Sequence, residues 1–121
     1  MMKKPLLEEQ TYVEHRNIAT QLESVYQEIN KLATKKPTEK ITPLIAKKIN
    51  HLIVKVKSIV TSDEFLDAIE TVPVDGNLIR LDETLILLGE LRGIMDKQWG
   101  SDKFVEFRNF HSKRHENQIL R

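Results

Sequence analysis

The stretch that decides the fold is residues 42–60, Thr-Pro-Leu-Ile-Ala-Lys-Lys-Ile-Asn-His-Leu-Ile-Val-Lys-Val-Lys-Ser-Ile-Val. Thr42 can cap a helix, and Pro43 suits the first helical position, where a missing N–H leaves no bond unmade. The apolar residues that follow are spaced three or four apart: Ile45, Ile49, Leu52, Val56 and Ile59, with Leu44, Ile53 and Val60 beside them. Such a band must be buried against other helices, so the stretch predicts a central helix.

The composition predicts one domain. The chain has 121 residues, of which 40% are hydrophobic and 31% charged, and its formal net charge is +1. These values are typical of a soluble globular chain, and the absence of cysteine excludes disulfides and cysteine-based metal sites. We expect a single helical domain over residues 1–121, with flexible ends at about 1–7 and 117–121.

A heptad pattern precedes the central helix. Its apolar members are Ile18, Leu22, Val25, Ile29 and Leu32, and His15 and Thr11 continue the same line backward. This pattern predicts a helix over about residues 8–34, whose narrow seam suits a bundle or a dimeric coiled coil. Lys35, Lys36 and Pro37 then mark its end.

The end of the central helix carries signals for a break. Thr61 with Glu64 forms a capping box, and Val60 with Phe65 a hydrophobic staple, so we expect a short new helix through about Thr71. Its buried side would consist of Phe65, Leu66, Ile69 and Val72. The alternative is one continuous helix to Thr71.

Residues 72–80 hold the strongest turn signal, Asp75-Gly76. A hairpin between 72–74 and 78–80 is one interpretation, but Pro73 disfavours a well-paired strand, so a plain loop is expected.

The next helix is predicted over residues 82–99, with Asp82 as its cap and a staple between Leu81 and Ile86. Its apolar residues, Leu85, Leu87, Leu88, Leu91, Ile94 and Met95, cover most of its circumference at the start. This predicts deep burial or a subunit interface. Gly89 and Gly93, one turn apart, predict close contact with another helix.

Gly100 and Ser101 separate this helix from a last one over about residues 102–118. The expected fold is therefore all-α, a small antiparallel bundle of four main helices with a loop or short β-ribbon at 72–80.

The heptad seam and the apolar excess of 81–95 together exceed the needs of one small bundle. We therefore expect a homodimer or contact with another protein. The interface candidates are Ile18, Leu22, Val25, Ile29, Leu87, Leu91 and Trp99.

The charges are distributed by segment: residues 31–57 hold eight lysines and one acid, Glu39. One interpretation is a solvated face beside the acidic segment 61–96. The other is a phosphate-binding surface for nucleic acid, with these candidates: Lys35, Lys36, Lys40, Lys47, Lys48 and Lys55. The excess of lysine over arginine and the lack of interleaved aromatic residues weigh against it.

Residues 108–115, Arg-Asn-Phe-His-Ser-Lys-Arg-His, hold an arginine, a polar residue and a histidine seven positions after the arginine. This spacing resembles the active-site motif of HEPN-domain ribonucleases, which are small helical domains that cleave RNA without metal. The resemblance implies that Arg108 stabilises the phosphate, Asn109 supports it, and His115 transfers a proton. It covers these eight residues only.

His111 and His115 are spaced for one metal, but two ligands do not make a site, and no metal or other cofactor is predicted. The start of the chain lacks a signal-peptide core, and no apolar run is long enough for a bilayer, so we expect a cytoplasmic protein without membrane contact. The preferred function is a non-enzymatic interaction or regulatory module that acts through protein–protein contacts. The alternatives are a nucleic-acid-binding accessory protein and the HEPN-like ribonuclease.

Overall fold

The computed structural model describes residues 3–60 and 63–99. This part of the chain forms four helices: α1 (Lys3–Lys35), α2 (Pro43–Ile59), α3 (Glu64–Ala68) and α4 (Leu81–Trp99). The predicted all-α bundle is confirmed, and the described residues contain no strand. The helix predicted over 102–118 lies outside the described residues, as does the predicted flexible end at 117–121.

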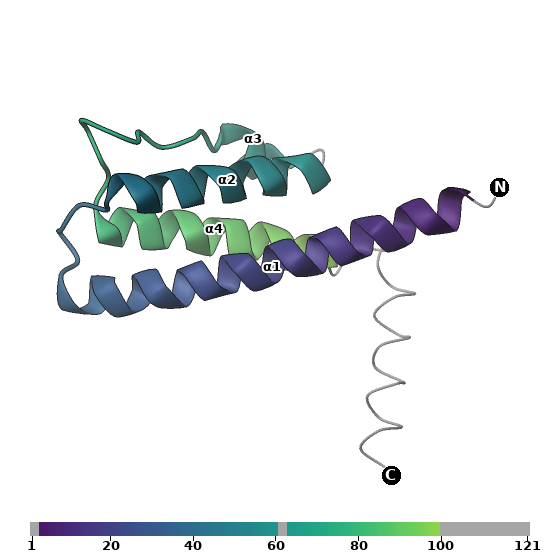
Figure 1. Cartoon of the computed structure of the whole chain (residues 1–121), viewed down its shortest axis with the longest axis horizontal. Coiled ribbons are helices and arrows are strands. Elements are labelled where there is room, and N and C mark those ends of the chain that lie inside the picture. The colour runs from purple at the N-terminus through teal and green to yellow at the C-terminus, as the bar shows by residue number, and fades with distance from the viewer. Residues whose placement is uncertain (1–2, 61–62, 100–121) are drawn as a thin grey trace, which may run out of the picture.

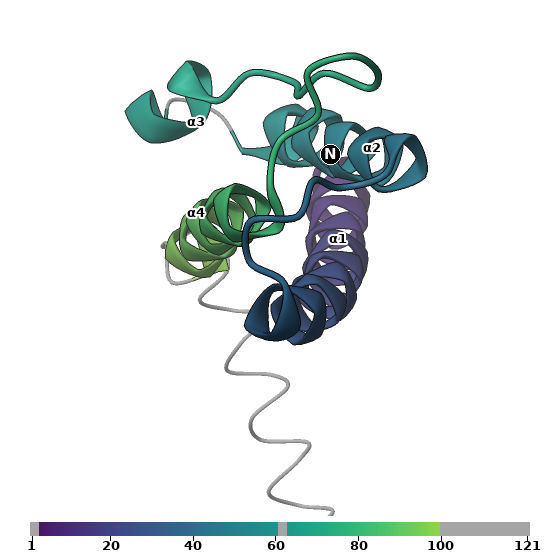
Figure 2. The same ribbon diagram turned by 90° about the vertical axis from the view of Figure 1, so that its left-hand side faces the viewer.

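The helices are packed lengthwise around one core. α1 runs antiparallel to both α2 and α4 (Figure 1), whereas α2 and α4 run parallel because the segment after α3 returns along the bundle. Seen end-on, α1, α2 and α4 surround the core, and α3 lies beyond α4 at the outside (Figure 2). α4 contacts each of the other three helices, and its largest contact is with α1. This central position explains why α4 is so rich in leucine.

α2 begins as the sequence predicts. The Thr42 hydroxyl accepts a hydrogen bond from the Ile45 N–H at 3.2 Å, and Pro43 is the first helical residue. Most of the predicted stripe is buried, and Ile45 is half-buried; the buried residues are Ile49, Leu52, Ile53, Val56, Ile59 and Val60. Leu44 is an exception, since 65% of it is exposed.

α1 is longer than predicted, because it begins at Lys3 rather than at about residue 8. Its seam is buried at Ile18, Leu22 and Ile29, but at the end of the helix Ala33 is buried and Leu32 is exposed. A straight α-helix drifts by about 20° per heptad relative to a strict seven-residue repeat. The core-facing line therefore moves from Leu32 to Ala33.

α3 begins later than the capping box predicted. Asp63 is its cap, and Asp63 Oδ1 accepts hydrogen bonds from the N–H groups of Phe65 (2.9 Å) and Leu66 (3.0 Å). With the helix starting here, Leu66 turns into the core, whereas its neighbour Phe65 is 74% exposed. The predicted staple between Val60 and Phe65 is wrong. α3 ends at Ala68 rather than at Thr71.

A single continuous helix to Thr71 is also wrong, because the backbone at Val60 is extended (φ −104°, ψ 119°). Residues 72–80 form the expected loop, and Gly76 supplies its positive φ of 70°. The end of this loop meets the α1–α2 connection: Ile41 N–H donates to Ile79 O at 2.9 Å, within an isolated antiparallel bridge between Lys40 and Arg80.

α4 begins at Leu81, one residue before the predicted cap Asp82, and that same connection accepts hydrogen bonds from its first N–H groups. The N–H of Leu81 donates to Glu39 O at 2.8 Å, and the N–H of Asp82 donates to Pro37 O at 3.0 Å. Two of the free N–H groups at the helix start are thereby satisfied by another segment. The Asp82 carboxylate binds the Arg80 guanidinium at 2.7 Å and also accepts a hydrogen bond from the Glu83 N–H at 2.8 Å, so it satisfies a third N–H group from inside the first turn.

Two other predictions for α4 are wrong. Ile86 is 65% exposed while Leu81 is buried, so the two residues do not form a staple. The two glycines do not mark a tight helix contact either. A Cβ at Gly89 would lie 3.9 Å from Tyr26, which is ordinary contact, and a Cβ at Gly93 would meet nothing within 4 Å.

Candidate functional site

The six candidate lysines are all exposed, but the fold divides them. Lys35 ends α1, and Lys36 and Lys40 follow it in the α1–α2 connection, where Lys36 lies 3.9 Å from Glu39. Lys47, Lys48 and Lys55 lie on α2. Lys47 and Lys48 border a hollow in the surface.

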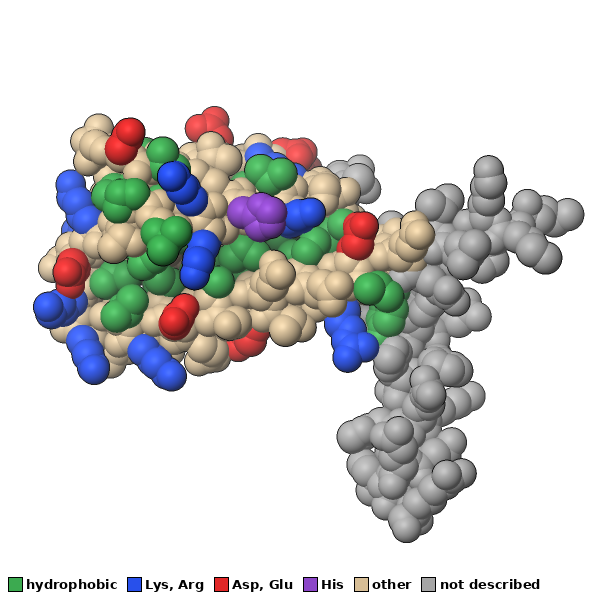
Figure 3. Space-filling view, viewed as in Figure 1, with side chains coloured by type: hydrophobic (Ala, Val, Ile, Leu, Met, Phe, Trp, Pro, Cys, Tyr) green, Lys and Arg blue, Asp and Glu red, His purple; other side chains and the backbone are tan. Residues whose placement is uncertain are grey.

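The hollow lies between α1 and α2, and we call it the α1–α2 groove. Its volume is about 440 Å³, and its lining consists of Gln21, Ser24, Val25, Leu44, Lys47, Lys48, His51 and Leu52. Figure 3 shows apolar side chains along this face, with lysine or arginine side chains beside them. The groove therefore combines an aliphatic floor with a cationic edge on one side.

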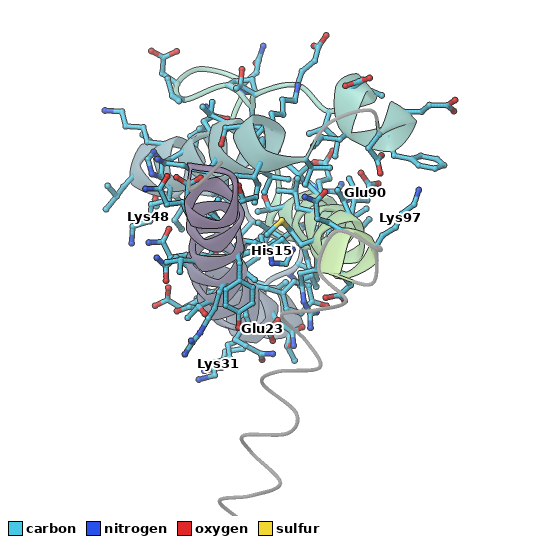
Figure 4. All side chains as sticks on the ribbon, turned by 90° about the vertical axis from the view of Figure 1, so that its right-hand side faces the viewer. His15, Glu23, Lys31, Lys48, Glu90 and Lys97 are labelled. Carbon is cyan, nitrogen blue, oxygen red and sulfur yellow. The ribbon has the colours of Figure 1, made fainter. Side chains whose placement is uncertain are left out.

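The cationic edge has no counterion in the described part of the chain. Neither Lys47 nor Lys48 lies within 4 Å of an acidic side chain among residues 10–60 and 63–98. Glu23, the neighbour of Ser24 in sequence, is engaged elsewhere, because its carboxylate binds Arg92 of α4 at 2.8 Å. Figure 4 shows Lys48 and Glu23 directed to different sides of the bundle.

Sequence reasoning placed Leu44 in the buried stripe of α2 and did not single out His51. Leu44 lies in the first turn of α2, directly after Pro43, and is 65% exposed. His51 stands one turn from Lys47 and Lys48 on the same face. Residues 44, 47, 48 and 51 are spaced three or four apart, which places them on one face of the helix. This spacing is the feature of the sequence that indicates the surface.

The interface candidates are used mainly inside the chain. Ile18, Leu22, Ile29 and Leu91 belong to the core, and Leu87 is half-buried against it. Val25 is also half-buried, but it lines the α1–α2 groove as well. Trp99 is the last residue of α4, and its side chain lies outside the described part of the structure.

His15 is a buried polar residue at the contact between α1 and α4. It is 4% exposed, and its Nε2 lies 3.0 Å from the carbonyl oxygen of Met95 (Figure 4). Burial lowers the pKa of His15 below its ordinary value of 6.5, against the opposing effects of the Met95 carbonyl and of Asp96. A neutral imidazole that donates to a carbonyl joins the two helices, which is a structural role.

A second hollow, of about 760 Å³, lies between α3 and α4. It is lined by Phe65, Ile69, Gly93 and Ile94, with Asp63, Glu64, Glu90 and Lys97 among its polar residues. Lys97 Nζ lies 3.8 Å from Asp63. Figure 4 places Glu90 and Lys97 on the opposite side of the bundle from Lys48. The two hollows are therefore separate surfaces.

The described residues do not assemble a metal-binding group. They contain no group of three His, Asp or Glu side chains that could hold a metal ion. Arg108, Asn109, His111 and His115 lie outside the described residues, so the HEPN-like motif and the histidine pair stay predictions. Of the helices in the described part, none has the length and apolar character needed to cross a membrane.

The chain matches no protein-family model, no curated protein and no solved structure. The function therefore has to be argued from the surfaces described above.

Proposed function

We propose that this protein is a non-enzymatic helical interaction module that binds another protein through the α1–α2 groove. The observation that supports this is Leu44, an aliphatic side chain 65% exposed beside the half-buried Val25 and the buried Leu52. Contiguous apolar surface bordered by polar side chains is typical of protein-binding sites. A regulatory role would follow from what the partner does.

The chemistry of the groove also favours binding over catalysis. Its lining offers two amines, one imidazole and the Ser24 hydroxyl but no carboxylate. Ser24 comes from α1 and His51 from α2, and no hydrogen bond is found between them among the described contacts. General acid–base chemistry needs partners within hydrogen-bond reach of one another or of a substrate.

Self-association remains a prediction, with less support than the sequence suggested. The homodimer was expected because of the heptad seam and of the apolar excess in 81–95. In the fold, both are largely buried within one chain, since α1 and α4 pack against each other. Sedimentation of the full chain over a range of concentrations measures the oligomeric state directly.

The interaction is tested by placing a photo-crosslinking amino acid at position 44 of the full chain in the cells that naturally produce it. We expect a protein adduct from position 44. The matched control is position 54, because Val54 is 57% exposed on the same helix but does not line the groove. Equal yields at both positions, or no protein adduct at position 44, would contradict the proposal.

Nucleic-acid binding is the second candidate, supported by the exposure of all six lysines. Its affinity would fall steeply with salt, because each phosphate contact releases counterions. Replacing Lys47 and Lys48 by glutamate should then abolish binding to labelled RNA or DNA. An unchanged affinity would exclude this surface as the nucleic-acid site.

A further inference from the structure

Building on the proposed function, we infer that the α1–α2 groove binds an amphipathic helix of another protein that carries acidic side chains beside its apolar face. Helices commonly dock in grooves by inserting apolar side chains spaced three or four apart. The aliphatic floor of Val25, Leu44 and Leu52 suits such side chains, and the volume of about 440 Å³ suits a few of them.

The charge of the partner follows from the edge of the groove. Lys47 and Lys48 are both exposed, and within the described residues no acid neutralises them. Glu23, the neighbour of Ser24 on α1, does not neutralise these lysines, because its carboxylate binds Arg92 at 2.8 Å. Complementary charge at the rim of an interface selects partners and speeds their association. The complement of this rim is aspartate or glutamate.

A second copy of the same chain fits this groove poorly. In a two-fold dimer through the groove, the same patch faces itself, so Lys47 and Lys48 of the two copies would be brought close together. Like charges across an interface are unfavourable. Acidic residues that border other hollows lie away from this groove: Glu64 and Glu90 line the α3–α4 hollow, on the other side of the bundle. Glu23 and Asp96 line a hollow between α1 and α4.

Nucleic acid also fits less well than an acidic helix. The lining contains no Phe, Tyr or Trp on which a base could stack, its one ring is the imidazole of His51, and its floor consists of aliphatic side chains. A phosphate backbone would use Lys47 and Lys48 but would leave the exposed Leu44 without an apolar partner. An acidic amphipathic helix uses both features of the groove.

The test uses the full chain and three labelled synthetic peptides of about five helical turns. They share one leucine stripe, and their flanking residues are all glutamate, all glutamine or all lysine. We expect the glutamate peptide to bind about tenfold more tightly than the glutamine peptide at low salt, as measured by fluorescence anisotropy. In the variant with Lys47→Glu and Lys48→Glu, we expect the lysine peptide to bind best.

The matched control carries Lys31→Glu and Lys57→Glu, which change the net charge equally at exposed positions outside the groove. It should keep the preference for the glutamate peptide. Leu44→Asp should weaken the binding of the glutamate peptide by about tenfold, and Val54→Asp should leave its binding unchanged. The reversed preference of the first variant also shows that it is folded.

The inference is overturned if the glutamate and glutamine peptides bind equally, or if the double lysine variant keeps the original preference. It is also overturned if RNA binds in a way that depends on Lys47 and Lys48 but not on Leu44. None of these results changes whether position 44 crosslinks to a protein in the photo-crosslinking experiment. Failure of the inference is therefore distinguishable from failure of the proposed function.

Discussion

The side-chain amide of Asn50 makes two hydrogen bonds with the backbone of Val72. Asn50 Nδ2 donates to the Val72 carbonyl oxygen at 2.9 Å, and Val72 N–H donates to Asn50 Oδ1 at 2.7 Å. Asn50 lies within α2, and Val72 lies in the segment that returns from α3 to α4. The side chain thereby satisfies backbone groups for which the loop offers no strand partner. It fixes the return segment against α2.

We expect Asn50→Ala to lower the free energy of unfolding by about 1–3 kcal/mol, because it leaves the donor and acceptor of Val72 without their partner. Chemical denaturation measures this value. Asn17→Ala, at an exposed position of α1, is the control and should change stability by less than about 0.5 kcal/mol. Equal effects of the two substitutions would show that the Asn50 contact contributes nothing specific.

His15 predicts a dependence of stability on pH. Because burial lowers its pKa in the folded state, the unfolded chain takes up a proton first as the pH falls. The contribution of neutral His15 to the free energy of unfolding is therefore fully present above its ordinary pKa of 6.5. It is lost as the pH falls through that value toward the lower pKa of the folded state. Thermal unfolding between about pH 8 and pH 5 should show this decline.

The control for His15 is His15→Gln, which keeps a hydrogen-bond donor but cannot be protonated in this range. Its stability should fall less steeply with acid than that of the unchanged protein. Identical slopes for the two proteins would refute the role of His15.

Replacing Gly93 or Gly76 by alanine should change the stability of the protein in opposite directions. Gly93 lies inside α4 with free space at its Cβ position, so Gly93→Ala should stabilise the protein by about 0.5–1 kcal/mol through helix propensity. Gly76 has a φ of 70°, so Gly76→Ala should destabilise it by about 1 kcal/mol despite the open space around it. Melting temperatures of the two variants measure both effects. Shifts of the same sign would contradict the backbone argument.

The HEPN-like motif makes a prediction about RNA. If residues 108–115 act as the resemblance implies, the full chain cleaves single-stranded RNA in the presence of a chelator, and His115→Ala eliminates cleavage without unfolding the protein. Gel analysis of end-labelled RNA measures the cleavage, and circular dichroism checks the fold. Cleavage that persists in the variant would assign it to a contaminant or to another site.

The sequence by itself determined the helical class, the start of α2 at Thr42-Pro43 and the apolar faces of the helices. These features depend on local periodicity and on caps within one segment. It also indicated that residues 72–80 would form a loop, since Pro73 disfavours strand pairing and Gly76 permits the positive φ of a turn.

Tertiary structure alone decided which groups meet across the chain. Leu81 and Asp82 donate their N–H groups to Glu39 and Pro37, a pairing between distant segments that no local pattern encodes. The same holds for Asn50 with Val72, and for the exposure of Leu44, which depends on where α1 leaves α2 uncovered. Periodicity specifies that an apolar face exists, but the packing of the other helices specifies how much of it remains available to a partner.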